Sequence, residues 1–491
     1  MNYKLSKSTF IRGLQCEKSL YLYKNHYNLK DPISASQQAV FDQGNEIGLL
    51  AQSLFPGGVD ASPVSHFNIL DSVTKTKEFL SNGETIIYEA TFLFNEVLVA
   101  LDVLVKDNQG WKAYEVKSST SVSDTHIKDA AVQYYTITNS GLILEDISIV
   151  HINNQYVLKD NVDVGQLFTI KSVKEQVQNF LPKIPSEISR LKKVIELKSP
   201  PKIEIGSYCN KPYDCDFKGT CWKDVPEYSI FNLSNLKLNT KLELYKNGVH
   251  TIDQVDLEET KLNKNQILQV KTELSQAPYF EKNNIDKFLS HLSYPLYFLD
   301  FETVNPAIPK YSGTKPYQQV VFQYSLHLKK SKLSKLEHKE FLAEPNNDPR
   351  VKFISNLIND CGNSGDVLVY NISFERKRLN ELGEQFPKFK AKLESIVERL
   401  KDLMVPFQKK WYYTPKMKGS YSIKQVLPAL IPGLSYNKLN IQSGESSRLT
   451  FLSMVNKKFK GNELTTRKDL LEYCKLDTYA MVKIVDRLFE L

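Results

Sequence analysis

The chain has 491 residues, 41% of them hydrophobic and 24% charged, which excludes a wholly disordered protein and is too long for one hydrophobic core. Its formal net charge of +8 fits a polyanionic partner better than an acidic one. No apolar run reaches the length of a membrane span, and the N-terminus lacks the apolar core of a signal peptide. We therefore expect a cytoplasmic protein of two or three domains with no membrane partner.

The first 58 residues predict two helices. One helix is expected from Leu5 to Tyr27 and carries Cys16. A second follows the Ser and Asp residues near position 31, has its apolar residues at helical spacing, and ends before the Pro-Gly-Gly of residues 56–58. Six cysteines in a reducing compartment are better explained as thiols or metal ligands than as disulfides. We expect Cys361 and Cys474 to be buried thiols.

Residues 97–120, VLVALDVLVKDNQGWKAYEVKSST, predict a β-hairpin with a turn near Asp107. Side chains two apart on a strand share a face, so Glu115 and Lys117 should point the same way, with Asp102 beside them. Two carboxylates suit Mg²⁺ or Mn²⁺, and an amine can stabilise the charge on a phosphate. An exposed strand with ordinary surface charges is the alternative that a bare E-x-K leaves open.

Beyond the hairpin, a helix is predicted over residues 124–139, a strand pair over 144–158 and helical structure over 173–197. A cysteine-rich loop follows, in which Cys209, Cys215 and Cys221 have C-x5-C-x5-C spacing. Structural zinc usually takes two tight C-x2-4-C pairs, whereas a four-thiolate iron–sulfur cluster is compatible with this spacing. Zinc, or a loop without metal, remains the alternative.

An Asp that ends one strand, E-V-K on the next, and an early cysteine with three late ones resemble the PD-(D/E)xK nucleases, specifically their RecB-like branch with an iron–sulfur cluster, which includes the CRISPR adaptation exonucleases. The resemblance implies a nuclease domain over residues 1–226. Its catalytic and metal-binding residues would be Asp102, Glu115, Lys117 and, in DAAVQYYTI, Gln133. A [4Fe–4S] cluster would clasp the ends of the domain through Cys16, Cys209, Cys215 and Cys221.

Two positions depart from that family's pattern. Ile137 stands where a tyrosine usually follows the glutamine, and Gly48 occupies the position where many members carry a metal-binding histidine. A helical connector is then predicted over residues 227–285. In it a helical run ends at Gly248 and Thr251 can cap the next helix, which resembles a phosphate-binding helix-hairpin-helix unit. Two plain helices that join domains are the alternative.

A second acidic centre is predicted in the C-terminal part of the chain. In SYPLYFLDFETVNP a buried strand carries Asp300 and Glu302, which share a face. In DVLVYNISFERKRLNEL a strand leads to Glu375, and in LLEYCKLDTYAMVKIV one helical turn separates Tyr473 from Asp477. Three unrelated acidic surface residues are the alternative.

The order of these three motifs resembles that of the tyrosine-type DEDD exonucleases, which have an RNase H-like fold. The resemblance implies that a domain over residues 286–491 removes nucleotides from a 3′ end, with two metal ions bound by Asp300, Glu302, Glu375 and Asp477. Tyr473 would orient the attacking water. Glu375 stands where aspartate is usual, and Asp402 lies where related exonucleases often have an acidic residue.

Cations and aromatic residues alternate between the second and third motifs, as in grooves that bind single strands: Lys409, Lys410, Trp411, Tyr412, Tyr413, Lys416 and Lys418. A solvated loop with a few buried rings is the alternative. The lysine-rich run 329–339 is expected to be an exposed hairpin end.

The sequence thus predicts a multidomain α/β protein with a restriction-endonuclease-like mixed sheet, an RNase H-like mixed sheet and a small helical connector, and it resembles a bacterial family that fuses these two nucleases. We expect hydrolysis of phosphodiester bonds in DNA, with single-stranded DNA as the first partner and RNA as the second. No P-loop motif is present, so unwinding would come from a helicase or a defence or repair partner. Two alternatives remain. In one, a single centre cuts and the other binds nucleic acid. In the other, the protein is an iron–sulfur nucleic-acid-binding component without catalysis.

Overall fold

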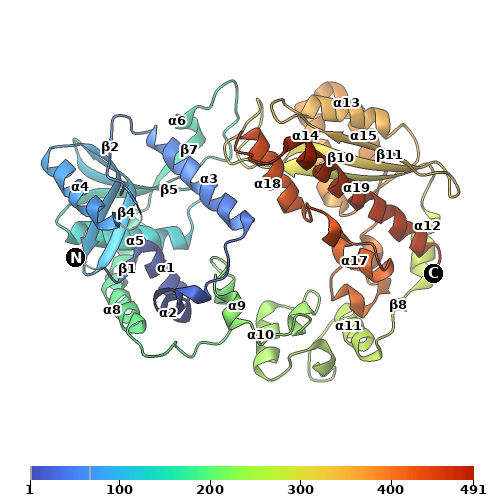
Figure 1. Ribbon diagram of the computed structural model, residues 1–491, viewed down its shortest axis with the longest axis horizontal. Coiled ribbons are helices and arrows are strands. Elements are labelled where there is room, and N and C mark those ends of the chain that lie inside the picture. The colour runs from blue at the N-terminus through green and yellow to red at the C-terminus, as the bar shows by residue number, and fades with distance from the viewer. Residues whose placement is uncertain (1–2, 66–67) are drawn as a thin grey trace. The chain divides into compact units, whose positions relative to one another are not determined.

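The computed structural model describes residues 3–65 and 68–491, which form two compact units (Figure 1). Unit 1 comprises Met1–Asp224 together with Ala307–Tyr317, and unit 2 comprises Val225–Pro306 and Gln318–Leu491. The connector belongs to unit 2, whereas Ala307–Tyr317, which the sequence assigns to the second domain, packs within unit 1. Both units combine helices with a mixed sheet, so the predicted multidomain α/β class is confirmed.

Unit 1 contains these elements in chain order: β1 (Leu5–Ser6), α1 (Lys7–Gln15), α2 (Glu17–Asn25), α3 (Ala35–Gln52), β2 (Val59–Asp60), α4 (Ile69–Ser81), β3 (Ile86–Phe94), β4 (Val97–Asp107), β5 (Gly110–Lys117), α5 (Asp124–Asn139), β6 (Leu144–Ile152), α6 (Val164–Leu167), β7 (Phe168–Ser172), α7 (Lys174–Phe180), α8 (Ile184–Ile195) and α9 (Lys218–Cys221). Its sheet has the order β2-β3-β4-β5-β6-β7, and β1 pairs with β4. Strands β3, β4 and β5 are antiparallel neighbours, and β6 is parallel to β5.

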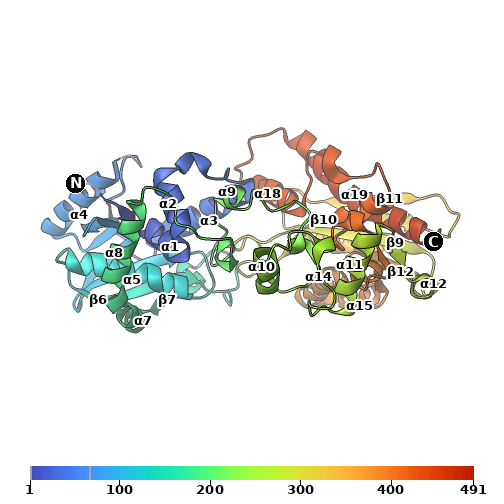
Figure 2. The ribbon, with the colours of Figure 1, turned by 90° about the horizontal axis from the view of Figure 1, so that it is seen from below.

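Alternation along β5 divides the core of unit 1 between the two faces of the sheet. Ala113 joins the cluster that includes Ala130 of α5, with α8 beside α5 (Figure 2). Tyr114 and Val116 join the other cluster, in which Ile47 of α3 is buried. Because Glu115 alternates with these two residues, its side chain lies on the face that α5 covers.

Two predicted elements of unit 1 are wrong in detail. The single helix expected from Leu5 to Tyr27 is broken at Cys16, whose extended backbone (φ −160°, ψ 116°) ends α1 and caps α2. The strand pair expected over residues 144–158 is the single strand β6, and its neighbour β7 begins only at Phe168. By contrast, the helix predicted over 124–139 is confirmed, and Ser123 caps it.

Unit 2 contains these elements: α10 (Leu238–Lys246), α11 (Lys264–Ser275), β8 (Tyr279–Phe280), α12 (Lys282–Ser290), β9 (Leu296–Val304), β10 (Val320–Lys329), β11 (Glu337–Leu342), α13 (Arg350–Asp360), β12 (Asp366–Val369), α14 (Ile372–Gln385), α15 (Lys390–Glu398), β13 (Leu400–Asp402), α16 (Val405–Gln408), β14 (Tyr412–Tyr413), α17 (Ile423–Leu430), α18 (Gly444–Val455) and α19 (Glu463–Leu488). Its main sheet has the order β11-β10-β9-β12-β13. The first three strands are antiparallel, and β12 and β13 run parallel to β9.

The middle strand β9 is covered on both faces, which explains its continuous buried run. Phe301 packs edge-on against Phe353 of α13 on one face. Residues of the opposite parity, Asp300 and Glu302, face α19. The long helix α19 contacts both β9 and β10 (Figure 1). The lysine-rich run after β10 forms the exposed turn into β11, as predicted, with Leu333 95% exposed.

The connector differs from the predicted helix pair. Helix α10 ends before Gly248, which has φ +88°, but Thr251 caps only a 3₁₀ turn, Ile252–Gln254. The helix-hairpin-helix resemblance therefore holds for the first helix and the glycine alone. Among the described residues, no helix is both long and apolar enough to cross a membrane.

Candidate metal centres

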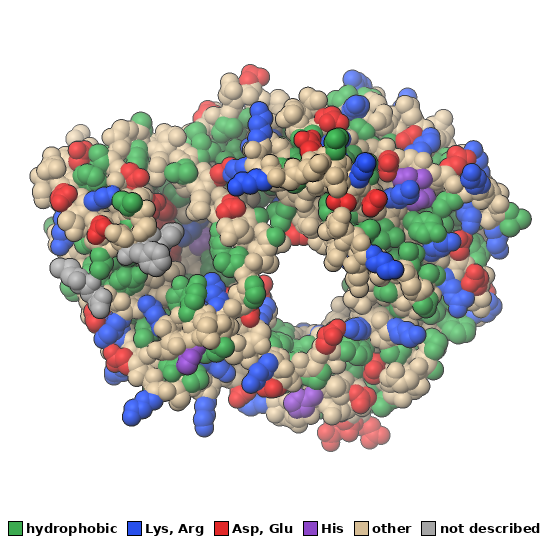
Figure 3. Space-filling model, viewed as in Figure 1, with side chains coloured by type: hydrophobic (Ala, Val, Ile, Leu, Met, Phe, Trp, Pro, Cys, Tyr) green, Lys and Arg blue, Asp and Glu red, His purple; other side chains and the backbone are tan. Residues whose placement is uncertain are grey.

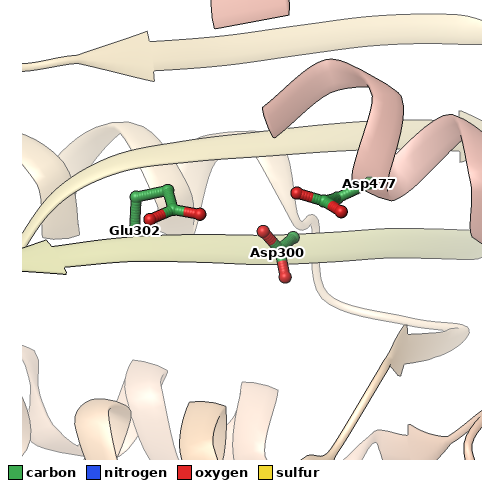
Figure 4. Close-up of side chains that lie close together, drawn as sticks. All are labelled: Asp300, Glu302 and Asp477. Atoms are coloured by element: carbon green, nitrogen blue, oxygen red, sulfur yellow. The ribbon is translucent and has the colours of Figure 1, made fainter. Parts of the chain in front are cut away.

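Three carboxylates of unit 2 meet between strand β9 and helix α19. Asp300 and Glu302 lie two residues apart on β9, and Asp477 points toward them from α19 (Figure 4). One oxygen of each residue lies within 4.8 Å of the corresponding oxygens of the other two. Grouped carboxylate oxygens are the ligands that Mg²⁺ and Mn²⁺ prefer, so these three residues can hold a divalent ion.

Burial raises the pKa of all three groups, and repulsion between the carboxylates adds to the effect at Asp300 and Glu302. The pKa of Asp300 lies well above its ordinary value because the group is buried beside Asp477 and Glu302. Burial and the Asp477 charge raise the pKa of Glu302 to about 8. Burial raises the pKa of Asp477 to about 6, against a hydrogen bond from Tyr436 that lowers it. A bound cation would offset this repulsion.

Glu375, the departure from the usual aspartate, lies in the first turn of α14 and lines a cavity of about 340 Å³ that includes the three carboxylates. It is buried, and none of the described residues forms a hydrogen bond with its Oε2. Burial raises its pKa to about 8. Among the described residues, Glu375 does not belong to the group of three carboxylates that lie within 4.8 Å of one another. It lies in the cavity wall, where its carboxylate could bind a second ion.

Tyr473 and Lys424 also line the cavity, and Tyr436 supports Asp477 without being part of the lining. The Tyr436 hydroxyl donates to Asp477 Oδ1 at 2.6 Å, and Tyr473 lines the cavity one helical turn before Asp477. The Lys424 ammonium lies 5.4 Å and 5.3 Å from the ring centres of Tyr436 and Tyr473. The motif pattern identified Tyr473. It missed Tyr436, because this residue lies in a 3₁₀ turn with no fixed spacing to the motifs.

Asp402 has a structural role instead of facing the cavity. Its carboxylate accepts the backbone N–H groups of Asn371 and Ile372 at 3.1 and 3.2 Å and so satisfies the N-terminus of α14. The groove predicted from alternating cations and aromatic residues is wrong for Lys410 and Tyr413, which are buried with the ammonium 3.9 Å from the ring centre. Of that series, Lys418 lines a cavity in this part of unit 2.

The predicted hairpin of unit 1 brings its own charged residues together. The Lys117 ammonium lies 2.7 Å from Glu115 Oε1, and the backbone N–H of Val116 donates to Asp102 Oδ2 at 2.6 Å. Burial and the charge of Glu115 raise the pKa of Asp102 to about 7. Burial alone would raise the pKa of Glu115, but the ammonium groups of Lys117 and Lys7 outweigh burial and lower this pKa to about 2.

The helices that cover this face add three residues to the first centre. Lys7, at the start of α1, places its ammonium 2.6 Å from Glu115 Oε1. Asp129 and Gln133 come from α5: Asp129 accepts from Lys117 at 2.6 Å, and the Gln133 amide donates to Glu115 Oε2 at 3.0 Å. Of these three residues, Gln133 was predicted from the sequence, and Lys7 and Asp129 were not. The pattern D-x3-Q on one helix was the available signal for Asp129.

Glu89 is a further carboxylate at this centre that sequence analysis missed. Strand register pairs Tyr88 with Val103 and Ala90 with Leu101, so Glu89 lies opposite Asp102 on the neighbouring strand. Its φ of +54° is a strained conformation for a residue with a side chain, and such strain persists where the surrounding structure imposes it, often at functional sites. Burial raises the pKa of Glu89 to about 7.

The two departures from the RecB-like pattern have different surroundings. Ile137 is fully buried on α5, within the core of unit 1. A Cβ built on Gly48 would meet no atom within 4 Å, so sterically this position could carry a side chain. Glycine itself offers no ligand atom in its side chain, so this position adds none to the first centre.

All four predicted cluster cysteines line one pocket of unit 1: Cys16, Cys209, Cys215 and Cys221. Backbone N–H groups are directed at two of these sulfurs. The backbone N–H of Gly206 lies 3.5 Å from Cys209 Sγ, and backbone N–H groups of Ser19 and Lys18 bond to Cys16 at the start of α2. Burial raises the pKa of Cys16 and Cys221. Cys361 and Cys474 are fully buried elsewhere, as predicted.

The four sulfurs do not form a tight group. A single tetrahedral zinc ion holds thiolates about 4 Å apart, given Zn–S bonds of about 2.3 Å. In the described part of the chain, the one group of three ligand residues within 4.8 Å is acidic, so no three of these sulfurs meet that closeness.

Comparison with known proteins gives one family match. A family model described as a domain of unknown function (DUF2779) matches residues 297–422. The matched range contains Asp300, Glu302 and Glu375, and it ends before Tyr473 and Asp477.

Curated relatives are similar over part of the chain. An uncharacterised protein of Ureaplasma parvum is 28% identical over 226 residues, which cover 41% of this chain and 32% of the relative. One from Mycoplasma genitalium is 30% identical over 209 residues, covering 38% and 31%. Its homologue from Mycoplasma pneumoniae is 28% identical over 206 residues, covering 38% and 31%. The matches thus span about a third of the length of each of these relatives.

Proposed function

We propose that the protein is a metal-dependent nuclease that hydrolyses phosphodiester bonds in single-stranded DNA, with RNA as the second substrate to test. The observation that carries this proposal is the group formed by Asp300, Glu302 and Asp477, whose oxygens lie within 4.8 Å of one another in a cavity that Glu375 also lines. Divalent ions bound there would activate water and neutralise charge on the phosphate.

At the second centre the protein groups have separate tasks. Asp300, Glu302 and Asp477 would hold one ion, and Glu375 would contribute to a second. The Tyr473 hydroxyl would orient the attacking water, and Tyr436 fixes Asp477 by its 2.6 Å hydrogen bond. Lys424 and Arg448 line or face the same cavity and would bind the phosphate oxygens.

At the first centre Asp102 and Glu115, with Glu89 nearby, would hold the divalent ion. In the described part of the chain these three carboxylates do not meet within 4.8 Å, so binding would draw them closer together. Lys117 is held by Glu115 and Asp129, so its ammonium is in place to stabilise charge that develops on the phosphate. Lys7 holds Glu115 from the other side. The RecB-like resemblance supports cleavage at this centre, because the residues of its motif meet on one face of the sheet.

We also propose a [4Fe–4S] cluster in the cysteine pocket, where Cys16, Cys209, Cys215 and Cys221 would hold it. Such a cluster would join α1 and α2 to the loop near residue 215 and limit the unfolded chain. The proposed setting is the cytoplasm. A helicase or another repair or defence component would supply unwinding, since the sequence carries no P-loop motif.

The test is cleavage of end-labelled single-stranded DNA by anaerobically purified full-length protein with Mn²⁺. Glu302→Gln and Lys117→Gln should each remove a distinct set of products, with losses of at least about 100-fold, because each deletes a charged group at its own centre. Glu398→Gln and Lys171→Gln make the same chemical changes at exposed sites of the same units and should cleave normally.

Three other outcomes would change the proposal. If one substitution alters nothing, the centre it belongs to is a binding platform for this substrate. If wild-type protein leaves DNA intact but cleaves RNA, the substrate assignment changes while the chemistry stands. If neither is cleaved, the protein is a nucleic-acid-binding component without catalysis.

A further inference from the structure

Unit 2 contains a second cavity, of about 620 Å³, which we name the connector pocket. One wall comes from the connector through Phe231, Asn232 and Lys241, and the other from the loop that leads into α17, through Lys418 and Tyr421. None of the described residues that line it is acidic. Its wall is therefore suited to a polar or anionic ligand.

A hydrogen bond joins the two walls. The Ser234 hydroxyl donates to the carbonyl oxygen of Gly419 at 2.5 Å. Within the connector wall, Gln269 donates to the carbonyl oxygen of Asn232 at 3.0 Å. Gly419 has φ +74°, and a Cβ there would meet Asn232 O at 2.0 Å, so this close approach requires glycine. The pocket is thus a fixed part of unit 2.

The connector pocket adjoins the carboxylate cavity. Tyr370, Asn371 and Ile423 line both, and the Tyr370 hydroxyl donates to the carbonyl oxygen of Tyr421 at 2.8 Å. Asn371, at φ +86°, is a strained residue at this shared wall. A flexible chain with one end at Asp300 can therefore continue into the connector pocket without leaving the surface of unit 2.

Positive charge lines this route. The N-terminus of α17 lies at the shared wall, and the side chain of Ser422 does not cap it. The first N–H groups of α17 form the positive end of the helix dipole, which attracts anions. Lys241 and Lys418 stand farther along. Lys418 pairs with Glu227, whose side chain is 87% exposed, and a pair this exposed is weak enough for a phosphate to replace it.

The lining of this pocket carries charge of one sign. On the face of the molecule seen in Figure 3, Lys and Arg side chains are interspersed with Asp and Glu. The pocket, by contrast, is lined by two lysines and by no acidic residue among those described. Tyr370 and Tyr421 add ring surface on which bases can stack.

We propose that the connector pocket binds the nucleotides of a single-stranded nucleic acid that follow the end held at the carboxylate cavity. Phosphates contact the N-terminus of α17, Lys418 and Lys241 in turn, and bases stack on Tyr421. This inference rests on the proposed function for the class of ligand. It assigns the connector a role in substrate binding, where the sequence predicted a domain joint or a helix-hairpin-helix phosphate site.

The test measures binding of a fluorescent single strand of about 12 nucleotides to full-length protein in EDTA, as DNA and as RNA. Lys418→Asn, which suits the left-handed backbone at φ +48°, and Lys241→Gln should each weaken binding about tenfold. Each should also lower the slope of log affinity against log salt by about 0.7, the effect of one lost phosphate contact. Lys246→Gln, an exposed lysine on the same helix as Lys241, should leave binding unchanged.

A dinucleotide substrate provides the second measurement, because it reaches the carboxylate cavity alone. With Mn²⁺, the pocket variants should raise KM for the 12-nucleotide strand and leave kcat/KM for the dinucleotide unchanged. Equal losses for both substrates, or an unchanged affinity for the long strand, would overturn the proposal. Binding that depends on the pocket without any cleavage would refute the nuclease proposal and leave this one standing.

Discussion

At the scale of single residues, the first centre depends on a residue in a strained conformation. Glu89 has φ +54° within strand β3, opposite Asp102, a backbone conformation that glycine adopts without steric cost. Such a conformation costs about 1–3 kcal/mol, so the rest of the fold holds the carboxylate in place. Placement of a third carboxylate beside Asp102 and Glu115 is the gain that explains this cost.

Glu89→Gly should therefore stabilise the protein and impair it at once. We expect an increase of about 1 kcal/mol in the free energy of unfolding, since glycine relieves the strain but loses more chain entropy. Cleavage at the first centre should fall at least tenfold. Urea unfolding and product analysis measure the two effects.

Glu96→Gly is the matched control, because Glu96 has φ +55° in the turn after β3 and lies outside the centre. It should leave cleavage unchanged. A Glu89→Gly variant with normal products would remove Glu89 from the metal site.

Side chains at both centres were predictable where local spacing places them. The E-x-K pattern gave Glu115 and Lys117, and the Y-x3-D pattern gave Tyr473 and Asp477. Lys7 lies 108 residues from its partner Glu115, and no local period connects the two. Glu89 has no signal either, because a positive φ at glutamate follows from the surrounding sheet and not from its own propensity.

At the scale of elements, α1 connects the first centre to the cysteine pocket. Lys7 at its start bonds to Glu115, and Cys16 follows its last residue. Midway along it, Arg12 makes a bidentate ion pair with Asp216 of the cysteine loop, with bonds of 2.6 and 3.0 Å. Gln15 donates to the carbonyl oxygens of Tyr208 and Tyr213 in the same loop.

Arg12→Gln should thus affect both sites together. Loss of the bidentate pair should cost about 2 kcal/mol, the value of hydrogen bonds between charged groups, and loosen the loop that holds Cys215. We expect lower iron and labile sulfide content, measured per purified chain, and fewer first-centre products, while second-centre products persist.

Arg12→Lys should give a similar loss, because an ammonium cannot reproduce the planar fork. Arg376→Gln, at an exposed position of α14, should change neither iron content nor cleavage. Full iron content in Arg12→Gln would show that the ion pair between α1 and the cysteine loop is not needed for the cluster.

Two histidines of unit 2, His327 buried and His338 half-buried, predict a loss of stability in acid. His327 on β10 contacts Thr478 Oγ1 at 2.8 Å, and its ring centre lies 4.5 Å from that of His338 on β11. Burial lowers the pKa of His327 to about 3 and that of His338 to about 4, and nearby positive charge adds to the effect. Both imidazoles are therefore neutral in the folded protein at neutral pH.

Because these folded-state pKa values lie below the unfolded value of about 6.5, the unfolded chain binds protons first as pH falls. Each histidine should lower the free energy of unfolding by up to about 1.4 kcal/mol per pH unit between pH 6.5 and its own pKa. Urea midpoints at pH 7 and pH 5 should converge in a His327→Gln, His338→Gln double variant. An exposed control, His291→Gln, should keep the wild-type dependence.

Element boundaries were predictable where caps and periodicity agree. The helix at 124–139 has its cap at Ser123 and a buried face, and both are visible in the sequence. The break at Cys16 was not, because FIRGLQCEKSLYLY has helical spacing throughout. Contacts with the distant cysteine loop decide that the chain is extended there.

At the scale of the whole molecule, the chain passes between the two units three times. It enters unit 2 after Asp224, returns to unit 1 for Ala307–Tyr317, and enters unit 2 again at Gln318. Nothing in the local sequence of that short segment shows which unit it joins. In unit 1 its Gly313 N–H donates to the carbonyl oxygen of Leu158, and the Tyr317 hydroxyl bonds to the Ser118 carbonyl oxygen.

The segment Ala307–Tyr317 follows closely in the chain after the strand of the second centre, and it packs within the unit that contains the first centre. Glu302 lies five residues before Ala307, and Tyr317 bonds to the residue directly after Lys117. Strand β9 therefore leaves the second centre and runs straight into a segment anchored at the edge of the first. Dividing the chain at the connector would therefore leave Ala307–Tyr317, a part of unit 1, on the fragment that carries unit 2.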